Sequence, residues 1–219
     1  MSRLRNEDYA TFRSPHTPEH DKMYARPERQ TDLRRLREVI TEHLGGLRVL
    51  EVACGTGYWT QFVAEVAQCV LAVDSNQDVL KIAKQRLKHF GNAALLLDDA
   101  YTLATIPDQF DAGFAAFWWS HIPRQNLPGF LDTFQSKLHK GATVIFTDNT
   151  FVEKSCSPIS QTDADGNTYY TKMQADGSEI QVMKNYPTPK EIQDLLAPRA
   201  RHLQMHHFEH YWCAAYQIA

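Results

Sequence analysis

Apolar residues recur along the middle of the chain at two alternating spacings. From Thr31 they follow a helical spacing as far as Gly45–Gly46, and Leu47–Ala53 is then a short apolar run that predicts a buried strand. The same alternation continues: helices are predicted over 58–67, 78–90 and 127–138, and strands over 69–73, 93–97, 110–118 and 142–147. Strands that alternate with helices in this way predict a parallel sheet with helices on both faces.

Two segments depart from this alternation. Residues 1–30 are polar and proline-rich, which predicts an irregular arm with one short helix. Residues 152–187 contain two Asp-Gly turn signals between β-prone runs, which predict a small antiparallel hairpin. A short helix is predicted from Thr188, and residues 202–218 are expected to supply the last strands.

These patterns predict the α/β fold class. We expect a Rossmann-like, doubly wound, mostly parallel seven-stranded sheet with an N-terminal helical arm and a small antiparallel β insertion. We expect residues 1–219 to form a single domain, in which the arm (1–30) acts as a lid and the insertion (152–187) caps the substrate.

Charge and cysteine usage exclude several classes of function. The net charge of −3 provides no general attraction for nucleic acid, and no apolar run is long enough for a membrane span. The four cysteines show no paired or zinc-binding spacing, which favours free thiols in the cytoplasm. Neither the four histidines at 202, 206, 207 and 210 nor the Asp163–Asn167 turn has the spacing of a metal site, so we expect no metal.

The most informative segment follows the first predicted strand, where Glu51-Val52-Ala53-Cys54-Gly55-Thr56-Gly57 leads into a helix. Glycines let the backbone pass close to a ligand. A dinucleotide-binding loop would have a third glycine at position 60, which is Thr, and an acid beside a pyrophosphate would be unfavourable. The Glu51 carboxylate instead suits a cationic ligand such as S-adenosylmethionine (SAM).

This segment resembles motif I of the class I SAM-dependent methyltransferases, and the resemblance extends from about Leu33 to Thr150. It implies that Asp74 binds the ribose hydroxyls and that Asp99, with Asp98 as the alternative, receives the adenine amino group. Tyr101 or Ser75–Asn76 would flank the adenine. The full set of expected donor-binding residues is Tyr24, Glu51, Ala53, Gly55, Gly57, Trp59, Asp74, Ser75, Asp99, Ala100, Ala116 and Phe117.

The methyl acceptor is expected beside Trp118-Trp119-Ser120-His121, which follows the fourth predicted strand. Trp118 and Trp119 would form a wall of the site, and His121 would be a general base or an orienting hydrogen-bond partner. The alternative is that the tryptophans pack in the core and His121 is structural. Tyr169 and Tyr186 of the insertion are expected to line the substrate pocket in part.

The resemblance implies a methyltransferase that moves a methyl group from SAM to an O, N or S atom of a small molecule, leaving S-adenosylhomocysteine (SAH). The alternatives are a nucleic-acid or protein methyltransferase, a nicotinamide-dependent Rossmann oxidoreductase, and a SAM-binding module without catalytic activity. The absence of a basic extension and of an Asn-Pro-Pro-Tyr string disfavours a DNA methyltransferase.

Overall fold

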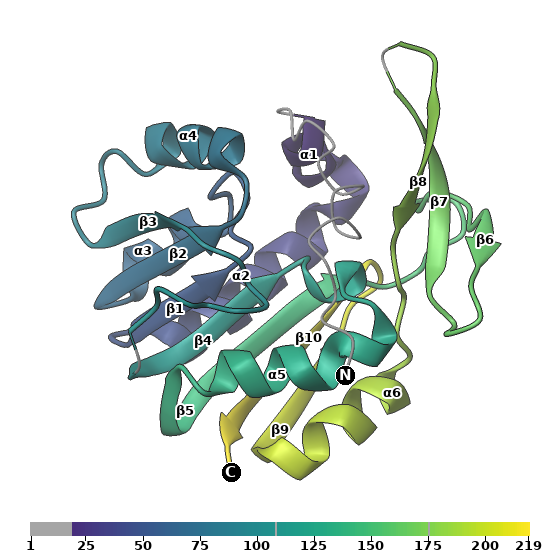
Figure 1. Ribbon diagram of the computed structural model, residues 1–219. Helices are drawn as coiled ribbons and strands as arrows, with labels where there is room; N and C mark the ends of the chain where they lie inside the picture. The colour runs from purple at the N-terminus through teal and green to yellow at the C-terminus, as the bar shows by residue number, and fades with distance from the viewer. Residues whose placement is uncertain (1–18, 108, 175) are drawn as a thin grey trace.

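The computed structural model describes residues 19–107, 109–174 and 176–219. Its main sheet has seven strands in the order β3-β2-β1-β4-β5-β10-β9 (Figure 1). The strands are β1 (Arg48–Val52), β2 (Cys69–Asp74), β3 (Ala93–Leu97), β4 (Phe110–Ala116), β5 (Leu138–Asn149), β9 (Ala200–His207) and β10 (Tyr211–Ile218). Strands β1 to β5 pair in parallel, whereas β10 runs antiparallel to β5 and β9. The predicted seven-stranded, mostly parallel sheet is confirmed.

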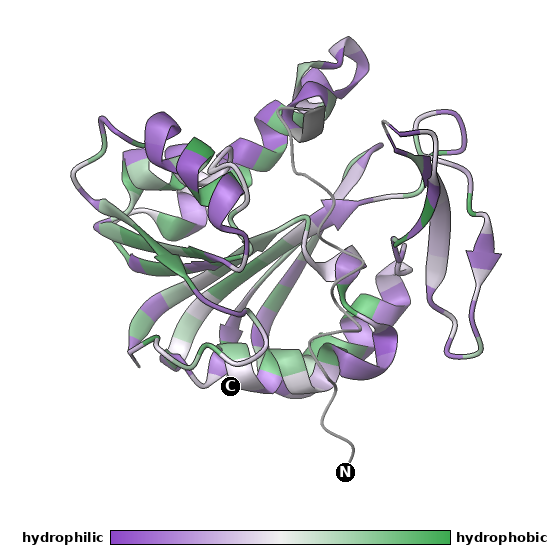
Figure 2. Cartoon of the chain, turned by 45° about the horizontal axis from the view of Figure 1, so that its top comes forward, coloured by the Kyte–Doolittle hydropathy of each residue, from purple (hydrophilic) through white to green (hydrophobic). Residues whose placement is uncertain are grey.

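Helices cover both faces of this sheet. Apolar residues of α2 (Gln30–Leu44), α3 (Thr60–Val66) and α4 (Gln77–Arg86) belong to one buried cluster. Those of α5 (Leu127–Gln135) and α6 (Pro189–Leu196) belong to a second cluster. Figure 1 shows α5 and α6 in front of the sheet and α2 behind it, and Figure 2 shows mostly hydrophobic residues along the central strands and both hydrophilic and hydrophobic residues along the helices.

Strand order reverses between β1 and β4. The chain first builds outward from β1 to β3 and then returns to the other side of β1 as β4. Ligands of open α/β sheets bind at the carboxyl ends of the strands at such a reversal. This edge of the sheet is therefore the place where the fold can hold a ligand.

Two additions flank the sheet. The insertion forms a second sheet of β6 (Gln161–Thr162), β7 (Thr168–Met173) and β8 (Glu179–Met183), and it projects beyond the main sheet in Figure 1. The arm contains α1 (Glu19–Lys22) and the short 3-10 helices η2 (Met23–Ala25) and η3 (Pro27–Arg29). Residues 1–18 of the predicted arm lie outside the described residues.

Most predicted elements are confirmed, with differences at their ends. The helix from Thr188 exists as α6, where Thr188 and Glu191 form a reciprocal capping box. The helix predicted over 127–138 is wrong at its end, because it stops at Gln135 and β5 already begins at Leu138. Gly141, with a φ of +78°, lies in an irregular stretch of β5 and does not end the helix.

Two further boundaries differ from the prediction. Strand β4 stops at Ala116 instead of residue 118, because Phe117 has a left-handed φ of 59° and the chain turns into η4 (Trp119–His121). Helix α4 ends at Arg86 instead of residue 90. Across the described ranges, we find no helix whose length and hydrophobicity would suffice to span a bilayer.

Candidate active site

The turn after β1 is built from left-handed backbone. Ala53, Gly55 and Gly57 have φ angles of 54°, 56° and 72°, and the backbone N–H of Cys54 donates to the Val73 carbonyl at 3.0 Å. A Cβ on Gly57 would lie 3.1 Å from that of Ala83, so this glycine allows α4 to pack closely. A Cβ on Gly55 would meet nothing within 4 Å, so its side of the turn faces open space.

Glu51 lies beneath this turn and is buried, with an exposed fraction of 1%. Its Oε2 atom has no hydrogen-bond partner among the described residues. Burial raises the pKa of Glu51 to about 8; the nearby Thr60 hydroxyl lowers it, and the charge of Asp74 raises it further. Among the described residues no arginine forms an ion pair with Glu51, and the buried Arg29 of the arm contacts other residues.

The acids at the ends of β2 and β3 lie beside the same turn. Asp74 Oδ2 accepts from the backbone N–H of Gly55 and Oδ1 from that of Asn76, each at 2.9 Å. A carboxylate has about four acceptor positions and can therefore accept several hydrogen bonds at once. Asp74 thereby connects the glycine turn to the edge of β2.

Asp98 and Asp99 differ in what they bind. Asp98 accepts from the Asp99 N–H at 2.7 Å and, through its second oxygen, from the Thr105 N–H and hydroxyl at 3.1 and 2.7 Å. Asp99 accepts from the Tyr101 N–H at 2.9 Å through Oδ1. Local bonds therefore occupy Asp98 more fully, which favours Asp99 as a ligand-binding acid. Ser75 is exposed after β2, and Ala100 is 8% exposed.

An aromatic cluster covers one side of the turn. Tyr24 of the arm stacks on Tyr58 with ring centroids 3.9 Å apart, and its hydroxyl accepts from Trp59 Nε1 at 3.2 Å. The Phe117 ring, just beyond Ala116, lies 5.7 Å from Tyr24 and 5.9 Å from Trp59. Trp59 is only 3% exposed and packs in the core, so it anchors the arm beside the turn.

Polar contacts also attach the arm to the turn. The Thr56 hydroxyl donates to Asp21 at 2.9 Å, and Arg86 of α4 forms an ion pair with the same carboxylate. Arg86 Nη1 also donates to the Thr56 carbonyl at 2.6 Å. The arm is therefore held at the turn after β1 by the Asp21–Arg86 ion pair and by the Thr56 hydroxyl, which contacts both residues.

The segment after β4 separates the two tryptophans. Trp119 is 3% exposed and packs against Phe146 and Trp212, so it is a core residue, as the alternative reading of this string holds. Trp118 is half-buried against Tyr101, and its Nε1 is buried without a hydrogen-bond partner in the described part of the chain. Trp118 remains the better candidate for a ligand wall.

His121 is held by the insertion. Its Nδ1 lies 2.9 Å from the Met183 carbonyl oxygen at the end of β8. A carbonyl can only accept, so Nδ1 carries the proton in this contact and Nε2 is the basic nitrogen of the neutral ring. The insertion thus sets the tautomer that a general base requires.

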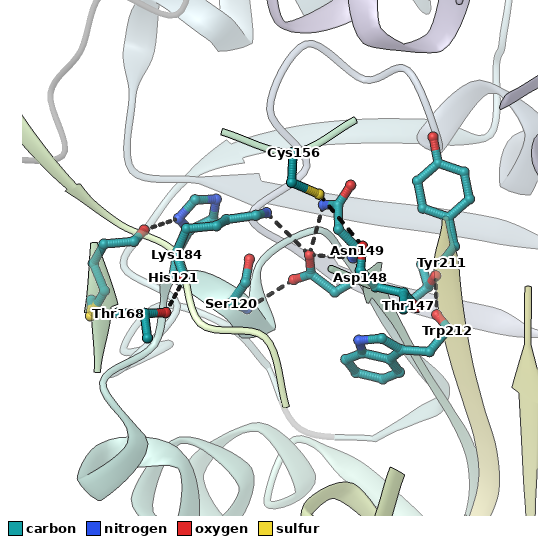
Figure 3. Close-up of polar contacts among 12 residues, drawn as sticks. Ser120, His121, Thr147, Asp148, Asn149, Cys156, Thr168, Lys184, Tyr211 and Trp212 are labelled. Carbon is teal, nitrogen blue, oxygen red and sulfur yellow. Dashed lines mark hydrogen bonds and ion pairs between the residues drawn. The ribbon is translucent and has the colours of Figure 1, made fainter. Parts of the chain in front are cut away.

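Figure 3 shows a polar group near His121 that the sequence analysis missed, centred on Asp148 of β5. Asp148 is fully buried, and it accepts from the Ser120 N–H at 2.8 Å, the Asn149 N–H at 2.7 Å and Lys184 Nζ at 3.2 Å. Burial alone would raise the pKa of Asp148, but the charges of Lys184 and His121 outweigh it and lower the pKa. Asp148 directly follows the strand predicted over 142–147, so the rule that ligands bind at the carboxyl ends of strands could have identified it. Lys184 gives no comparable local signal.

The two tyrosines of the insertion have different surroundings. The Tyr169 hydroxyl donates to Asp163 at 3.0 Å, within the insertion itself. Tyr186 packs against Phe151, and burial, followed by the neighbouring Cys156 and Asp148, raises its pKa. Tyr186 therefore lies near the Asp148 group, whereas Tyr169 helps to build the insertion.

A second missed residue is Arg29, which is 3% exposed at the end of η3. It reaches Asn149 at the end of β5 and Tyr211 at the start of β10, with N···O distances of 3.3 and 3.2 Å. The arm therefore touches the sheet edge at two places, beside β1 through Asp21 and beside β5 through Arg29.

A family model described as a methyltransferase domain matches residues 49–141. The chain is 27% identical over 109 residues to an uncharacterized methyltransferase of Geobacillus kaustophilus, which covers 50% of each protein. It is 28% identical over 81 residues to the demethylmenaquinone methyltransferase of Staphylococcus haemolyticus, covering 36% of this chain and 34% of that protein. The chain spans about half the length, or less, of the curated relatives it matches.

Solved structures share the fold over nearly the whole chain. A structure described as the DhpI-SAM-HEP complex superposes with a TM-score of 0.76 and 22% identity, covering 98% of each chain. The PH0226 protein of Pyrococcus horikoshii superposes with a TM-score of 0.74 and 16% identity, covering 99% of this chain and 100% of that one. At these identities the likeness concerns the fold.

Proposed function

We propose that this chain is a class I SAM-dependent methyltransferase and that it methylates a small molecule. The match of residues 49–141 to a methyltransferase domain supports this proposal. The acceptor atom would be an oxygen, nitrogen or sulfur. One relative favours a small acceptor, since it is named for demethylmenaquinone. The net charge of −3 disfavours a nucleic-acid substrate.

The buried Glu51 carboxylate carries the proposal for the donor. Its Oε2 lacks a hydrogen-bond partner among the described residues and lies in the strand that leads into the left-handed turn. A buried acid of this kind suits the methionine ammonium of SAM, directly or through water, and disfavours a pyrophosphate. When bound, SAM supplies a methyl group on a positively charged sulfur.

The remaining donor contacts are proposed from their places on the edge. The backbone at Ala53, Gly55 and Gly57 would pass beneath the donor. Asp74 would accept from the ribose hydroxyls, and Asp99 would accept from the adenine amino group. The other residues proposed for this half of the site are Tyr24, Ser75, Ala100, Ala116 and Phe117, with Trp59 acting through Tyr24.

The acceptor half would lie at the carboxyl ends of β4 and β5. His121 is the proposed base for an acceptor that loses a proton, because its contact with Met183 makes Nε2 the basic nitrogen. Trp118 and Tyr186 would form walls of this half. The arm and the insertion would exclude water, and the chain's main contribution would be to hold donor and acceptor in line.

Calorimetric titration with SAH and with NADH tests the donor assignment. We expect SAH to bind and NADH not to bind; the reverse would identify a nicotinamide enzyme. No binding of either would contradict the proposed function. A screen of small acceptors with methyl-labelled SAM then tests catalysis, and failure to label any acceptor while SAH binds would favour a silent SAM-binding module.

The role of His121 is tested with an acceptor from that screen. His121→Asn should lower kcat by about 10²–10⁴-fold, the usual contribution of a general base, while SAH affinity stays unchanged. His89→Asn is the matched control, because His89 follows α4, is exposed and contributes to none of the contacts above. A normal kcat in His121→Asn would assign the histidine to structure alone.

A further inference from the structure

Arg29 is a buried cation whose hydrogen bonds all go to neutral groups. Nη1 donates to Asn149 Oδ1 at 3.3 Å and to the Tyr211 hydroxyl at 3.2 Å. Nη2 donates to the Ser155 hydroxyl at 2.8 Å and to its carbonyl at 3.3 Å. Nε is buried and has no hydrogen-bond partner among the described residues.

No described acid forms an ion pair with Arg29. The buried acids at this end of the sheet have other partners: Asp32 accepts from the backbone and ring nitrogens of His210, and Asp148 pairs with Lys184. Each of these acids is therefore engaged by another group, and neither forms an ion pair with Arg29. A charge that leaves water without a counter-charge is strongly disfavoured, and buried charges are normally paired. Arg29 is therefore a buried cation without a directly paired acid among the described residues.

The unpaired edge of Arg29 has the chemistry of an oxyanion site. The Nε and Nη2 hydrogens point to the same side of a guanidinium and together bind carboxylates and phosphates in a two-pronged manner. Here Nε is unpartnered and Nη2 contacts the Ser155 hydroxyl. A hydroxyl can be exchanged for a ligand oxygen at little cost, because both accept the same hydrogen.

Arg29 lies where the two proposed halves meet, because its partner Tyr211 packs on Phe117 with ring centroids 5.4 Å apart. Its partners Asn149 and Tyr211 end β5 and begin β10, and these residues are paired across the two strands. In the order β1-β4-β5, the β5 end lies two strands from Glu51, which is about 10 Å at the usual strand spacing. The other partner of Arg29, Asn149, donates to Asp148, which pairs with Lys184 in the half where the acceptor is proposed.

From these observations we infer that the methyl acceptor carries an anionic group, a carboxylate or a phosphate-type oxyanion, and that Arg29 binds it. This inference rests on the proposed function. It names the substrate class that the sequence leaves open: a small anion rather than a neutral planar molecule.

Thermal unfolding of the full-length protein with saturating SAH tests the anion site. Inorganic phosphate and acetate, added at constant ionic strength against chloride, should each be tried beside neutral acetamide. We expect at least one of the two anions to raise Tm saturably and acetamide to have no effect. The absence of a saturable anion effect in the wild-type protein would overturn the inference.

Variants then locate the effect. Arg29→Gln should abolish the Tm rise. Arg29→Lys keeps the charge but loses the two-pronged geometry of the guanidinium, so it should weaken anion affinity by about tenfold. Arg26→Gln is the matched control, because exposed Arg26 contacts the same Ser155 carbonyl at 3.3 Å. A response lost equally in Arg26→Gln and Arg29→Gln would indicate general surface attraction and overturn the inference. If Arg29→Gln fails to fold, the lysine variant decides.

A last comparison separates the acceptor from the donor, whose methionine part also ends in a carboxylate. Arg29→Lys should bind SAH and 5′-methylthioadenosine, which lacks that carboxylate, as the wild type does. Weaker binding of SAH but not of methylthioadenosine would assign Arg29 to the donor and refute the inference. If the wild type binds no SAH, the proposed function itself fails, and this outcome is distinct from SAH binding without an anion effect.

Discussion

Glu51 provides the sharpest test of the donor site, because its buried acid must affect both stability and binding. The pKa of Glu51 is about 8 in the fold against an ordinary value of 4.5, mainly because burial disfavours the charged form. Below pH 4.5 the group is protonated in the folded and unfolded chains alike. Between pH 4.5 and 8 only the unfolded chain loses the proton, so stability falls as pH rises.

The size of this loss follows from the difference in pKa. Each pH unit in the interval costs about 1.4 kcal/mol, so the total at pH 7 is about 3 kcal/mol. Glutamine keeps the shape but cannot ionise. Glu51→Gln should therefore raise the free energy of unfolding of the ligand-free protein at pH 7 by up to about 3 kcal/mol, or roughly 6–10 °C in Tm. Near pH 4.5 the two proteins should unfold at similar temperatures.

Glu51→Gln should weaken SAH binding, although it stabilises the ligand-free protein. At pH 7 the free protein holds Glu51 protonated about ten to one, and an ammonium ligand favours the carboxylate. SAH binding should release close to one proton, and Kd should rise about tenfold per unit from pH 8 to pH 6. Calorimetry in two buffers with different heats of ionisation measures this release directly.

Two variants provide the controls for this prediction. Glu51→Gln should bind SAH weakly, and whatever pH dependence it keeps belongs to the ligand. Glu65→Gln, a change at an exposed glutamate of α3, should behave as the wild type does. A wild-type Kd that stays constant from pH 6 to 8 with no proton release would refute the reasoning, because Glu51 would then not meet the ligand as a carboxylate.

Two further predictions concern packing and the arm. A Cβ on Gly113 would lie 2.6 Å from the Phe134 ring, so Gly113→Ala should cost about 1–3 kcal/mol in chemical unfolding, whereas Gly129→Ala, where a Cβ meets nothing within 4 Å, should cost nothing. Equal midpoints would contradict this. Asp21→Asn removes the ion pair with Arg86, which is worth up to about 1 kcal/mol at partial exposure, so trypsin should cleave the arm up to about fivefold faster. Unchanged cleavage would show that the aromatic contacts alone hold the arm.

Local patterns were sufficient to predict the main sheet and the donor turn. Each of β1 to β3 is a short apolar run between helices with one apolar face, so strand, turn and cap signals agree there. Glu51 was identifiable because an acid within a buried strand is unusual, and the structure confirms its burial at 1% exposure. The proposed contacts of Asp74 and Asp99 with a ligand remain predictions.

The acceptor half was less predictable, because its groups meet across long separations in sequence. Arg29 and Asn149 are 120 residues apart, and Asp148 and Lys184 are 36 apart. No periodicity signals such contacts. Trp118 and Trp119 could not be told apart by local pattern either, because their different burial follows from the path of the chain after the turn at Phe117, whose φ is 59°.

The root of the insertion explains how a projecting hairpin can position an acceptor. Asn185 is 3% exposed, its N–H donates to the Ser120 carbonyl at 2.7 Å, and its side chain donates to the Ile122 carbonyl at 3.1 Å. Buried amides with satisfied hydrogen bonds hold one geometry, because any other leaves polar groups unpaired. The strand end that presents Lys184 to Asp148 is therefore fixed against the segment after β4.

Charge connects the two halves of the proposed site. Glu51 is a buried acid with an unpartnered oxygen beside β1, and Arg29 is a buried cation with an unpartnered nitrogen beside β5. A cationic donor would neutralise the first, and an anionic acceptor would neutralise the second. Each reactant would then leave water and meet an opposite charge in the site. The loss of hydration by an unpaired charge is the main cost of bringing ions into a closed site. In methyl transfer the S–CH3 bond breaks with its electron pair left on sulfur, and the positive charge passes to the attacking atom, where it cancels a negative charge or leaves with a proton. A site that excludes water favours this step where the two charges cancel.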